Sequence, residues 1–186
     1  MEKVNLIIFA RRPEISIGKR RLKNRIGKAL GANFYHRNLL RTILKIHNDS
    51  RIQLKLCVTP DSALKNWPKS IFPKVKRINQ GPGDIGEKMW RIFSNNTNKT
   101  IIIGSDIPDI TSKIILSAWK KLYLSNIVLG PAKDGGFWLI GLANSKKFKG
   151  IFNNVFWSQQ NTLSEVVKNI PPSESILYVD TLEDID

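Results

Sequence analysis

Short apolar runs that alternate with stretches of helical spacing are the feature of this sequence that most constrains its fold. The apolar runs predict strands at residues 4–9, 100–103, 127–129, 137–142 and 176–179, alternation of apolar residues predicts one at 52–58, and a short strand is expected at 75–78. Helical spacing predicts helices at residues 19–46, 84–93 and 111–124, and a fourth helix that opens with a capping box at residues 162–165. Because strands and helices alternate, we expect an α/β sandwich built on a mostly parallel sheet.

The length and the cysteine content narrow the class of protein. A chain of 186 residues fits one domain, residues 1–186, with a core that needs no cross-links. Cys57 is the single cysteine, which excludes an internal disulfide and a cysteine-rich zinc site. No apolar run reaches the roughly 18 residues that a membrane span needs. The apolar start is too short for a secretion signal and is followed, not preceded, by arginines, so we expect a cytoplasmic protein.

Basic residues outnumber acidic ones by 30 to 15, and the excess is concentrated in the first third of the chain. Residues 1–56 hold 14 Lys and Arg against 3 Asp and Glu, whereas residues 101–186 hold 8 against 9. A formal charge of +15 attracts nucleic acid, anionic membrane surfaces or phosphorylated small molecules. A solvated basic helix face would carry the same charge, so charge alone does not choose among these partners.

Two carboxylates lie near the ends of predicted strands. Asp106 lies after the apolar run 100–103, and Asp134 precedes Gly135 and Gly136 at the start of the run 137–142. Ligands of α/β sheets bind beyond the carboxyl ends of the strands, where a carboxylate can hold a hard cation or act as a base. The ring of Trp157 can form a wall beside a sugar or a base. The alternatives are a turn cap for Asp106, a plain hairpin for Asp134 and a core position for Trp157.

Two loops have the composition of anion or nucleotide sites. After the first strand, residues 9–22 combine loop amides with basic side chains at the start of a helix, which together can hold a diphosphate. Residues 80–89 place Gln80 and three glycines, including Gly83, before a helix, so that a flat ligand can approach the backbone closely. We expect Gln80 to hydrogen-bond a base edge. A rigid turn followed by a capped helix is the alternative.

Taken in order, these segments resemble the bacterial glycosyltransferase-A-like family of nucleotide-diphospho-sugar transferase relatives, some members of which are associated with arsenosugar biosynthesis. The matching segments cover nearly the whole chain. They are Phe-Ala-Arg-x-Pro (9–13), Lys-x-Arg-Leu (19–22), Gly-Asp-Ile-Gly-Glu-Lys-Met (83–89), Gly-Ser-Asp-x-Pro (104–108), Gly-Pro-Ala-x-Asp-Gly-Gly-Phe (130–137), Leu-Ile-Gly-Leu (139–142), Trp-Ser (157–158) and Val-Asp-Thr-x-Glu-Asp (179–184).

The resemblance implies a three-layer sandwich with a mixed, mostly parallel seven-stranded sheet. It implies a nucleotide site made by the first loop and the Gln80 loop, and a divalent cation, Mg²⁺ or Mn²⁺, on Asp106. Asp134 is expected on the acceptor-side loop, together with Gly135, Gly136 and Trp157. The residues expected on the nucleotide side are Phe9, Ala10, Arg11, Lys19, Arg21, Gln80 and Gly83.

Three functions remain open from the sequence. The first is a metal-dependent transferase that moves a sugar from a nucleotide-diphospho-sugar to a small acceptor, with Asp106 and Asp134 as catalytic residues. The second is a nucleotidyltransferase that joins a nucleoside triphosphate to a phosphorylated small acceptor. The third is a non-catalytic protein that binds nucleic acid or an anionic surface through residues 11–28.

Overall fold

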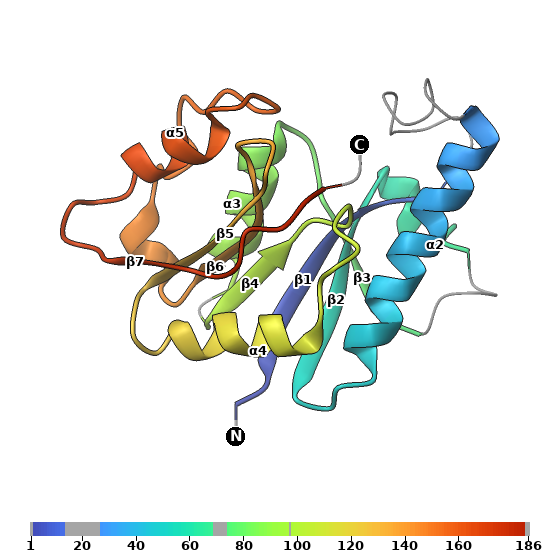
Figure 1. The fold of residues 1–186 in the computed structure, drawn as a ribbon, viewed down its shortest axis with the longest axis horizontal. Helices are drawn as coiled ribbons and strands as arrows, with labels where there is room; N and C mark the ends of the chain where they lie inside the picture. The colour runs from blue at the N-terminus through green and yellow to red at the C-terminus, as the bar shows by residue number, and fades with distance from the viewer. Residues whose placement is uncertain (1, 14–26, 69–73, 97, 185–186) are drawn as a thin grey trace.

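A computed structural model describes residues 2–13, 27–68, 74–96 and 98–184 of the chain (Figure 1). Among these residues, seven strands form one sheet in the order β3-β2-β1-β4-β6-β5-β7. The strands are β1 (Val4–Arg11), β2 (Ile52–Thr59), β3 (Lys76–Asn79), β4 (Thr100–Ile103), β5 (Ile127–Pro131), β6 (Phe137–Leu142) and β7 (Ile176–Tyr178). All neighbouring pairs are parallel except the two that involve β6, which runs against β4 and β5. The predicted mixed, mostly parallel sheet is confirmed.

Helices cover both faces of the sheet and make it the middle layer of a sandwich (Figure 1). They are α2 (Lys28–His47), α3 (Ile85–Ser94), α4 (Ser112–Lys121) and α5 (Thr162–Lys168), with short 3₁₀ turns at Asp61–Leu64 and Ser145–Phe148. Apolar residues of α2 and α4 share one core with the sheet, and those of α3 and α5 share the other. The face on which each helix packs follows from its buried stripe, as in α4, where Ile115, Ala118 and Trp119 are buried.

The central strand β1 belongs to both cores, because successive side chains of a strand point to opposite faces. Its residues are buried from Val4 to Ala10, and Arg11 at its end is exposed. Leu6 and Ile8 lie in the core beneath α2 and α4, while Ile7 and Phe9 lie in the core beneath α3 and α5. Such a strand needs apolar residues at every position, which the sequence 4–10 supplies except at Asn5.

The predicted helix boundaries agree with the structure in most places. Asp84 caps α3 through a capping box, in which its side chain accepts from the amide of Glu87 and the Glu87 carboxylate accepts from the amide of Asp84. The part of the helix expected at residues 19–26 lies outside the described residues. No helix among the residues described is long and apolar enough to cross a membrane.

The capping box expected at residues 162–165 is wrong. Thr162 is the first residue of α5 and not its cap, and its hydroxyl donates to the carbonyl oxygens of Phe156 and Gln159. The Glu165 carboxylate accepts from the backbone amide of Phe156, at 2.7 Å, and from the side-chain amide of Asn161, so it does not close a capping box with Thr162. The spacing of a threonine and a glutamate is the same in both arrangements, and the preceding loop decides which one forms.

Candidate active site

The sequence motifs meet at one edge of the sheet, because β1, β3, β4 and β5 are parallel and end on the same side. We call this the carboxyl edge and define it by residues 11–12, 80–84, 104–106 and 132–136, which end or follow those strands. The antiparallel strand β6 begins here, so the turn from β5 to β6 also lies at this edge. Four short segments from distant parts of the sequence therefore share the place where sheets of this type bind ligands.

The loop after β4 is held by a tyrosine of α2. The hydroxyl of Tyr35 accepts from the amide nitrogen of Arg11 at 2.9 Å and lies 3.2 Å from Ser105 Oγ. Ser105 is buried, and its hydroxyl donates to Asp106 Oδ1 at 3.4 Å. This chain of contacts ties the end of β1 to the end of β4 and positions the Asp106 carboxylate between them.

Asn38, one helical turn beyond Tyr35, makes the second link between α2 and this loop. Its side-chain amide donates to the carbonyl oxygen of Ser105 at 3.2 Å, and the residue is buried. On the other side, the amide of Gly104 donates to the carbonyl of Trp138 in β6. A methyl group built on Gly104 would meet no atom within 4 Å, so open space adjoins the residue two positions before Asp106.

The phenol of Tyr35 stays neutral at physiological pH. Its burial, and after that the negative charge of Asp106, raise the pKa of this hydroxyl above the ordinary value of a tyrosine. A neutral hydroxyl can accept from Arg11 and donate to Ser105 or to the Arg11 carbonyl, which lies 3.0 Å away. Tyr35 is therefore a positioning group at the carboxyl edge.

The Gln80 loop is also fixed by side-chain contacts, but Gln80 itself faces inward. It is 6% exposed, and its side-chain amide donates to the carbonyl of Cys57 in β2 at 3.0 Å. The guanidinium of Arg91 on α3 donates to the carbonyls of Gln80 and Pro82. Gln80 thus has a structural task in the sheet, and its role in reading a base stays a prediction.

Two glycines allow this loop to pass close to α3. Gly81 has a positive φ of 73°, and a methyl group there would lie 2.8 Å from Arg91 Nη1. Gly83, with a φ of 97°, would place a methyl group 2.1 Å from Glu87 Oε2. Side chains at both positions would strain the backbone and displace the groups that hold the loop.

Asp134 lies on the opposite side of the carboxyl edge, in the turn between β5 and β6. It is exposed, and its Oδ1 accepts from the amide of Gly136 at 2.9 Å, which is the hydrogen bond of an Asx turn. The amide of Gly135 donates to the carbonyl of Ala132 in the same turn. The alternative of a plain hairpin therefore accounts for the backbone here, while the second carboxylate oxygen of Asp134 faces no partner among the hydrogen bonds described.

Gly135 joins this turn to the loop before α5. Its φ is 88°, and a methyl group on it would lie 1.9 Å from the carbonyl oxygen of Gln160. Its own carbonyl accepts from the amide of Leu163 at 3.0 Å. The ring of Trp157, in the same loop, packs edge-on to Phe137 with centroids 6.4 Å apart and covers Gly86 of α3.

The structure describes only some of the residues that were predicted to bind the nucleotide in the first loop. Phe9 and Ala10 are buried in the two cores, so a nucleotide near them would meet backbone rather than their side chains. Arg11 is exposed at the carboxyl edge. Lys19 and Arg21 lie outside the described residues.

The donors present fit a cation that arrives with a phosphate ligand. No three His, Cys, Asp or Glu side chains among the described residues are grouped as in a metal cage made by protein alone. Mg²⁺ needs only one or two carboxylates when it keeps waters and takes phosphate oxygens from a substrate, and Mn²⁺ has the same preference for oxygen. Asp106, partly exposed beside the open space at Gly104, matches that requirement.

Three residues of this edge escaped the sequence analysis: Tyr35, Asn38 and Arg91. Each lies on a helix, where a polar side chain is usually solvated. A signal was present for the first two, because Tyr35 and Asn38 stand at helical spacing from the buried residues Leu39 and Thr42 and so belong to the face that meets the sheet.

Comparison with known families and structures gives one family match and several structural ones. A family described as "Uncharacterized protein conserved in bacteria (DUF2064)" matches residues 42–159. No curated protein matches the sequence.

The structural matches extend over the whole fold. A candidate nucleotide-diphospho-sugar transferase from Desulfovibrio desulfuricans G20 has a TM-score of 0.83 at 23% identity, over 100% of this chain and 83% of that one. A 4-diphosphocytidyl-2C-methyl-D-erythritol synthase from Anaerococcus prevotii has a TM-score of 0.60 at 11% identity, over 96% and 87%. A glucosyl-3-phosphoglycerate synthase from Mycobacterium tuberculosis, solved with Mn²⁺ and uridine diphosphate, has a TM-score of 0.55 at 10% identity, over 100% and 72%. At these identities the likeness concerns the fold.

Proposed function

We propose that this chain is a metal-dependent glycosyltransferase. It belongs to the bacterial family described as "Uncharacterized protein conserved in bacteria (DUF2064)", and it folds like nucleotide-diphospho-sugar transferases. The donor is a nucleotide-diphospho-sugar and the acceptor is a small molecule. The observation that carries the proposal is the position of Asp106 at the carboxyl edge, braced by Ser105 and Tyr35 beside open space.

The nucleotide side of the proposed site is the end of β1 together with the Gln80 loop. Arg11 is exposed there and supplies a positive charge that can neutralise a diphosphate, with Lys19 and Arg21 assigned the same task from the sequence. The glycine backbone at Gly81 and Gly83 leaves room for a flat base to approach. Fixing the donor in this way lowers the entropy cost of reaching the reactive geometry.

Asp106 would hold the divalent cation, which as a Lewis acid would stabilise the negative charge that develops on the leaving nucleoside diphosphate. The residues around Asp106 keep its carboxylate oriented, since Ser105 Oγ donates to Oδ1. Tyr35 remains protonated in this setting, so it contributes a fixed dipole and no second negative charge.

Asp134, Gly135, Gly136 and Trp157 form the proposed acceptor side. The exposed Asp134 carboxylate is the candidate base for an acceptor hydroxyl, which it would deprotonate as the bond to the sugar forms. The turn that carries it is fixed by its own Asx hydrogen bond and by Gly135 against Gln160, so the carboxylate has a defined place.

A nucleotidyltransferase is the second candidate. Its support is the similarity in fold to the diphosphocytidyl-methylerythritol synthase of Anaerococcus prevotii. In that reaction the acceptor phosphate would attack the α-phosphorus of a nucleoside triphosphate and pyrophosphate would leave. Both reactions need a cation on the phosphates, so Asp106 does not separate them.

The test begins with ligand-induced thermal stabilisation by nucleoside triphosphates, nucleoside diphosphates and nucleotide sugars, each with and without Mn²⁺. A ligand at 100 times its dissociation constant stabilises by about 2.7 kcal/mol. At this chain length the melting temperature rises by roughly 5–10 °C. The nucleotide sugar that gives the largest Mn²⁺-dependent rise is then the donor in an assay of nucleoside diphosphate release.

Asp106→Asn is the decisive variant and Asp109→Asn, three residues away and exposed, is its matched control. We expect Asp106→Asn to lower turnover about 10³-fold and to remove the Mn²⁺ dependence, with Asp109→Asn unchanged. Equal activity in the two variants contradicts the metal assignment. Pyrophosphate release from a triphosphate supports the second candidate, and salt-sensitive RNA binding without any nucleotide effect supports a binding protein.

A further inference from the structure

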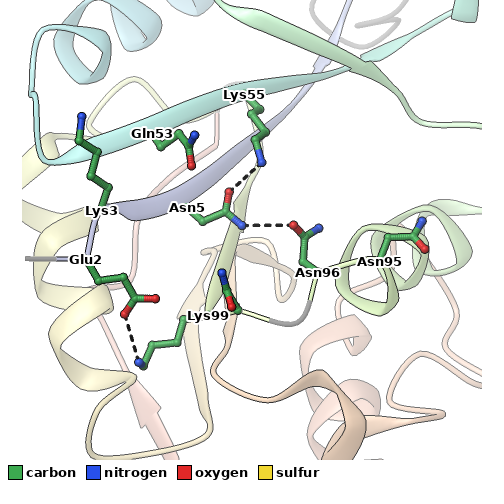
Figure 2. A pocket seen from close by; sticks show the side chains of 9 residues that line it. Glu2, Lys3, Asn5, Gln53, Lys55, Asn95, Asn96 and Lys99 are labelled. Carbon is green, nitrogen blue, oxygen red and sulfur yellow. Dashed lines mark hydrogen bonds and ion pairs between the residues drawn. The ribbon is translucent and has the colours of Figure 1, made fainter.

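A pocket lies at the other end of the same strands. It measures about 330 Å³ and lies beside the residues that precede or begin β1, β2 and β4 (Figure 2). We call it the amino-edge pocket and define it by Lys3, Asn5, Gln53, Lys55, Asn96 and Lys99, which line it with a few further polar side chains. Asn5 precedes Arg11 by six residues of β1, so about 20 Å of strand separates Asn5 from the carboxyl edge.

Polar residues of the strands themselves form the floor of the pocket. The register pairs Asn5 with Gln53 and Ile7 with Lys55, so these four side chains point to one face of the sheet. That face is the one covered by α3, since Ile7 packs with the apolar residues of that helix. Parallel strands are normally apolar on both faces. Asn5 and Lys55 depart from this rule at the end of the sheet beyond the last turn of α3.

The floor is pre-arranged by hydrogen bonds. Asn5 is nine-tenths buried, and its amide nitrogen donates to Thr100 Oγ1 at 2.8 Å. Its carbonyl oxygen accepts from Lys55 Nζ at 3.2 Å (Figure 2). An ammonium group has three N–H donors, and among the described residues Asn5 takes one of those of Lys55. The remaining donors can bind an anion in the pocket.

The charge of the pocket favours an anion. Glu2, the carboxylate in its lining, accepts from the hydroxyl of Tyr123 at 3.2 Å and lies 3.4 Å from Lys99 Nζ. The opposite charges of Glu2 and Lys99 cancel, so the positive charges of Lys3 and Lys55 remain in the pocket. The end of α3 adds a negative partial charge of about half a unit, which does not reverse the balance.

We propose that the amino-edge pocket binds a small phosphorylated polyol, such as a sugar phosphate. Lys3 and Lys55 would neutralise the phosphate, whose charge-assisted hydrogen bonds are stronger than neutral ones. The exposed amide of Gln53 offers both donors and an acceptor, and Asn96 keeps one N–H donor besides the one that bonds the carbonyl of Ile92, which suits hydroxyl groups. The volume is at the lower end of ordinary ligand pockets and exceeds what inorganic phosphate needs. This inference is independent of the proposed transferase reaction.

The experiment is a titration of the full ¹⁵N-labelled chain with glucose 6-phosphate at constant ionic strength. Glucose and inorganic phosphate are separate arms. Backbone and side-chain amide signals locate the binding site by residue. We expect saturable shifts at Asn5, Gln53 and Asn96 with glucose 6-phosphate, weaker shifts with phosphate, and none with glucose. Signals of Ser105 and its neighbours report the carboxyl edge, so binding there is seen separately.

Lys55→Gln should weaken the binding of glucose 6-phosphate at least tenfold, and Lys168→Gln, an exposed lysine of α5, should leave it unchanged. Gln53→Ala is a second variant that keeps the charge and removes one amide. Asp106→Asn should not alter this binding. The proposal is overturned if no saturable shift occurs at Asn5 or Gln53 below about 10 mM ligand. It is also overturned if Lys55→Gln and Lys168→Gln bind alike, or if phosphate binds as tightly as glucose 6-phosphate.

Discussion

The two sides of the carboxyl edge are held in place by different kinds of contact. On one side, the ends of β1 to β4 are tied together by helix side chains, with Tyr35 and Asn38 reaching from α2 and Arg91 from α3. We call this the α2 side. On the other, the turn from β5 to β6 meets the loop before α5 through backbone atoms, at Gly135 and Gln160. We call this the hairpin side.

This difference indicates which side of the carboxyl edge can change its conformation when a ligand binds. A contact made by a long side chain can shift with a rotamer, so the α2 side is able to move slightly as a ligand enters. A glycine whose missing methyl group would lie 1.9 Å from a carbonyl oxygen leaves no such freedom. The proposed donor side is therefore the adaptable one, and the proposed acceptor side is rigid.

The largest effect is expected from Gly135→Ala on the hairpin side. The added methyl group collides with the backbone of Gln160, and the positive φ disfavours any side chain. We expect a loss of about 2–3 kcal/mol. This corresponds to a fall of roughly 5–10 °C in melting temperature, measured by calorimetry. Gly104→Ala is the matched control, because its methyl group enters open space. Equal melting temperatures would show that the hairpin side is not rigid.

Tyr35→Phe tests the α2 side and should have a smaller effect. The change removes the hydroxyl that Arg11 and Ser105 contact, at a cost of about 1 kcal/mol. The melting temperature should fall by roughly 2–4 °C. If Tyr35 positions Asp106, the variant also needs more Mn²⁺ for half-maximal stabilisation by the donor. An unchanged Mn²⁺ requirement, with the same fall in stability, would reduce Tyr35 to a packing role.

Asp134→Asn separates the structural role of the turn from its proposed chemistry. Asparagine keeps the oxygen that accepts from Gly136, so stability should change by less than about 0.5 kcal/mol. Turnover should fall about 10²-fold if Asp134 is the base, with donor binding unaffected. Full turnover in this variant would leave Asp134 with the hairpin role alone.

The smallest effect is expected at Cys57, which lies under the α2 side next to Gln80. Burial raises the pKa of this thiol to about 12, so at pH 8 the folded protein carries almost no thiolate. A disulfide reagent should therefore react with the unfolded chain and hardly at all with the folded one. Fast reaction of the folded protein would show that the α2 side opens.

The raised pKa of Cys57 also determines how the free energy of unfolding changes with pH. The unfolded thiol ionises near its ordinary pKa of 9.0, while the folded thiol keeps its proton to higher pH. The folded state then binds more protons, so the free energy of unfolding falls as the pH rises above about 9. Cys57→Ala should flatten this part of the pH profile.

Most of the sheet could be predicted from the sequence, because all of its strands except β2 and β3 coincide with apolar runs. The run 100–103 matches β4 residue for residue, and the helix predicted at 84–93 begins at a real capping box of Asp84 and Glu87. The same pairing of types misled at Thr162 and Glu165, since the loop from Phe156 to Gln159 captures both side chains. A local pattern predicts a cap only when no neighbouring loop competes for it.

The two sides of the carboxyl edge also differ in how well they can be predicted from the sequence. The hairpin side shows in the sequence as an aspartate followed by two glycines, because a close backbone approach requires glycine. The α2 side depends on Tyr35 and Asn38, which are 70 and 67 residues away from Ser105 along the chain. Helical spacing places both residues on the buried face of α2, but their contacts with Ser105 follow from how α2 lies on the sheet, which local spacing does not encode.

The hairpin side is completed late in synthesis, because residues that follow the edge strand β7 contribute to it. Residues after β7 complete it: the amide of Leu182 donates to the carbonyl of Pro131, and Trp138 Nε1 donates to the carbonyl of Asp180. A ribosome adds about 5–20 residues per second, so Leu182 is made roughly 3–10 s after Pro131. Throughout that interval the nascent chain has its α2 side but only part of the opposite wall. The hairpin side is therefore completed only when the last strand of the sheet, β7, and the residues after it have been made.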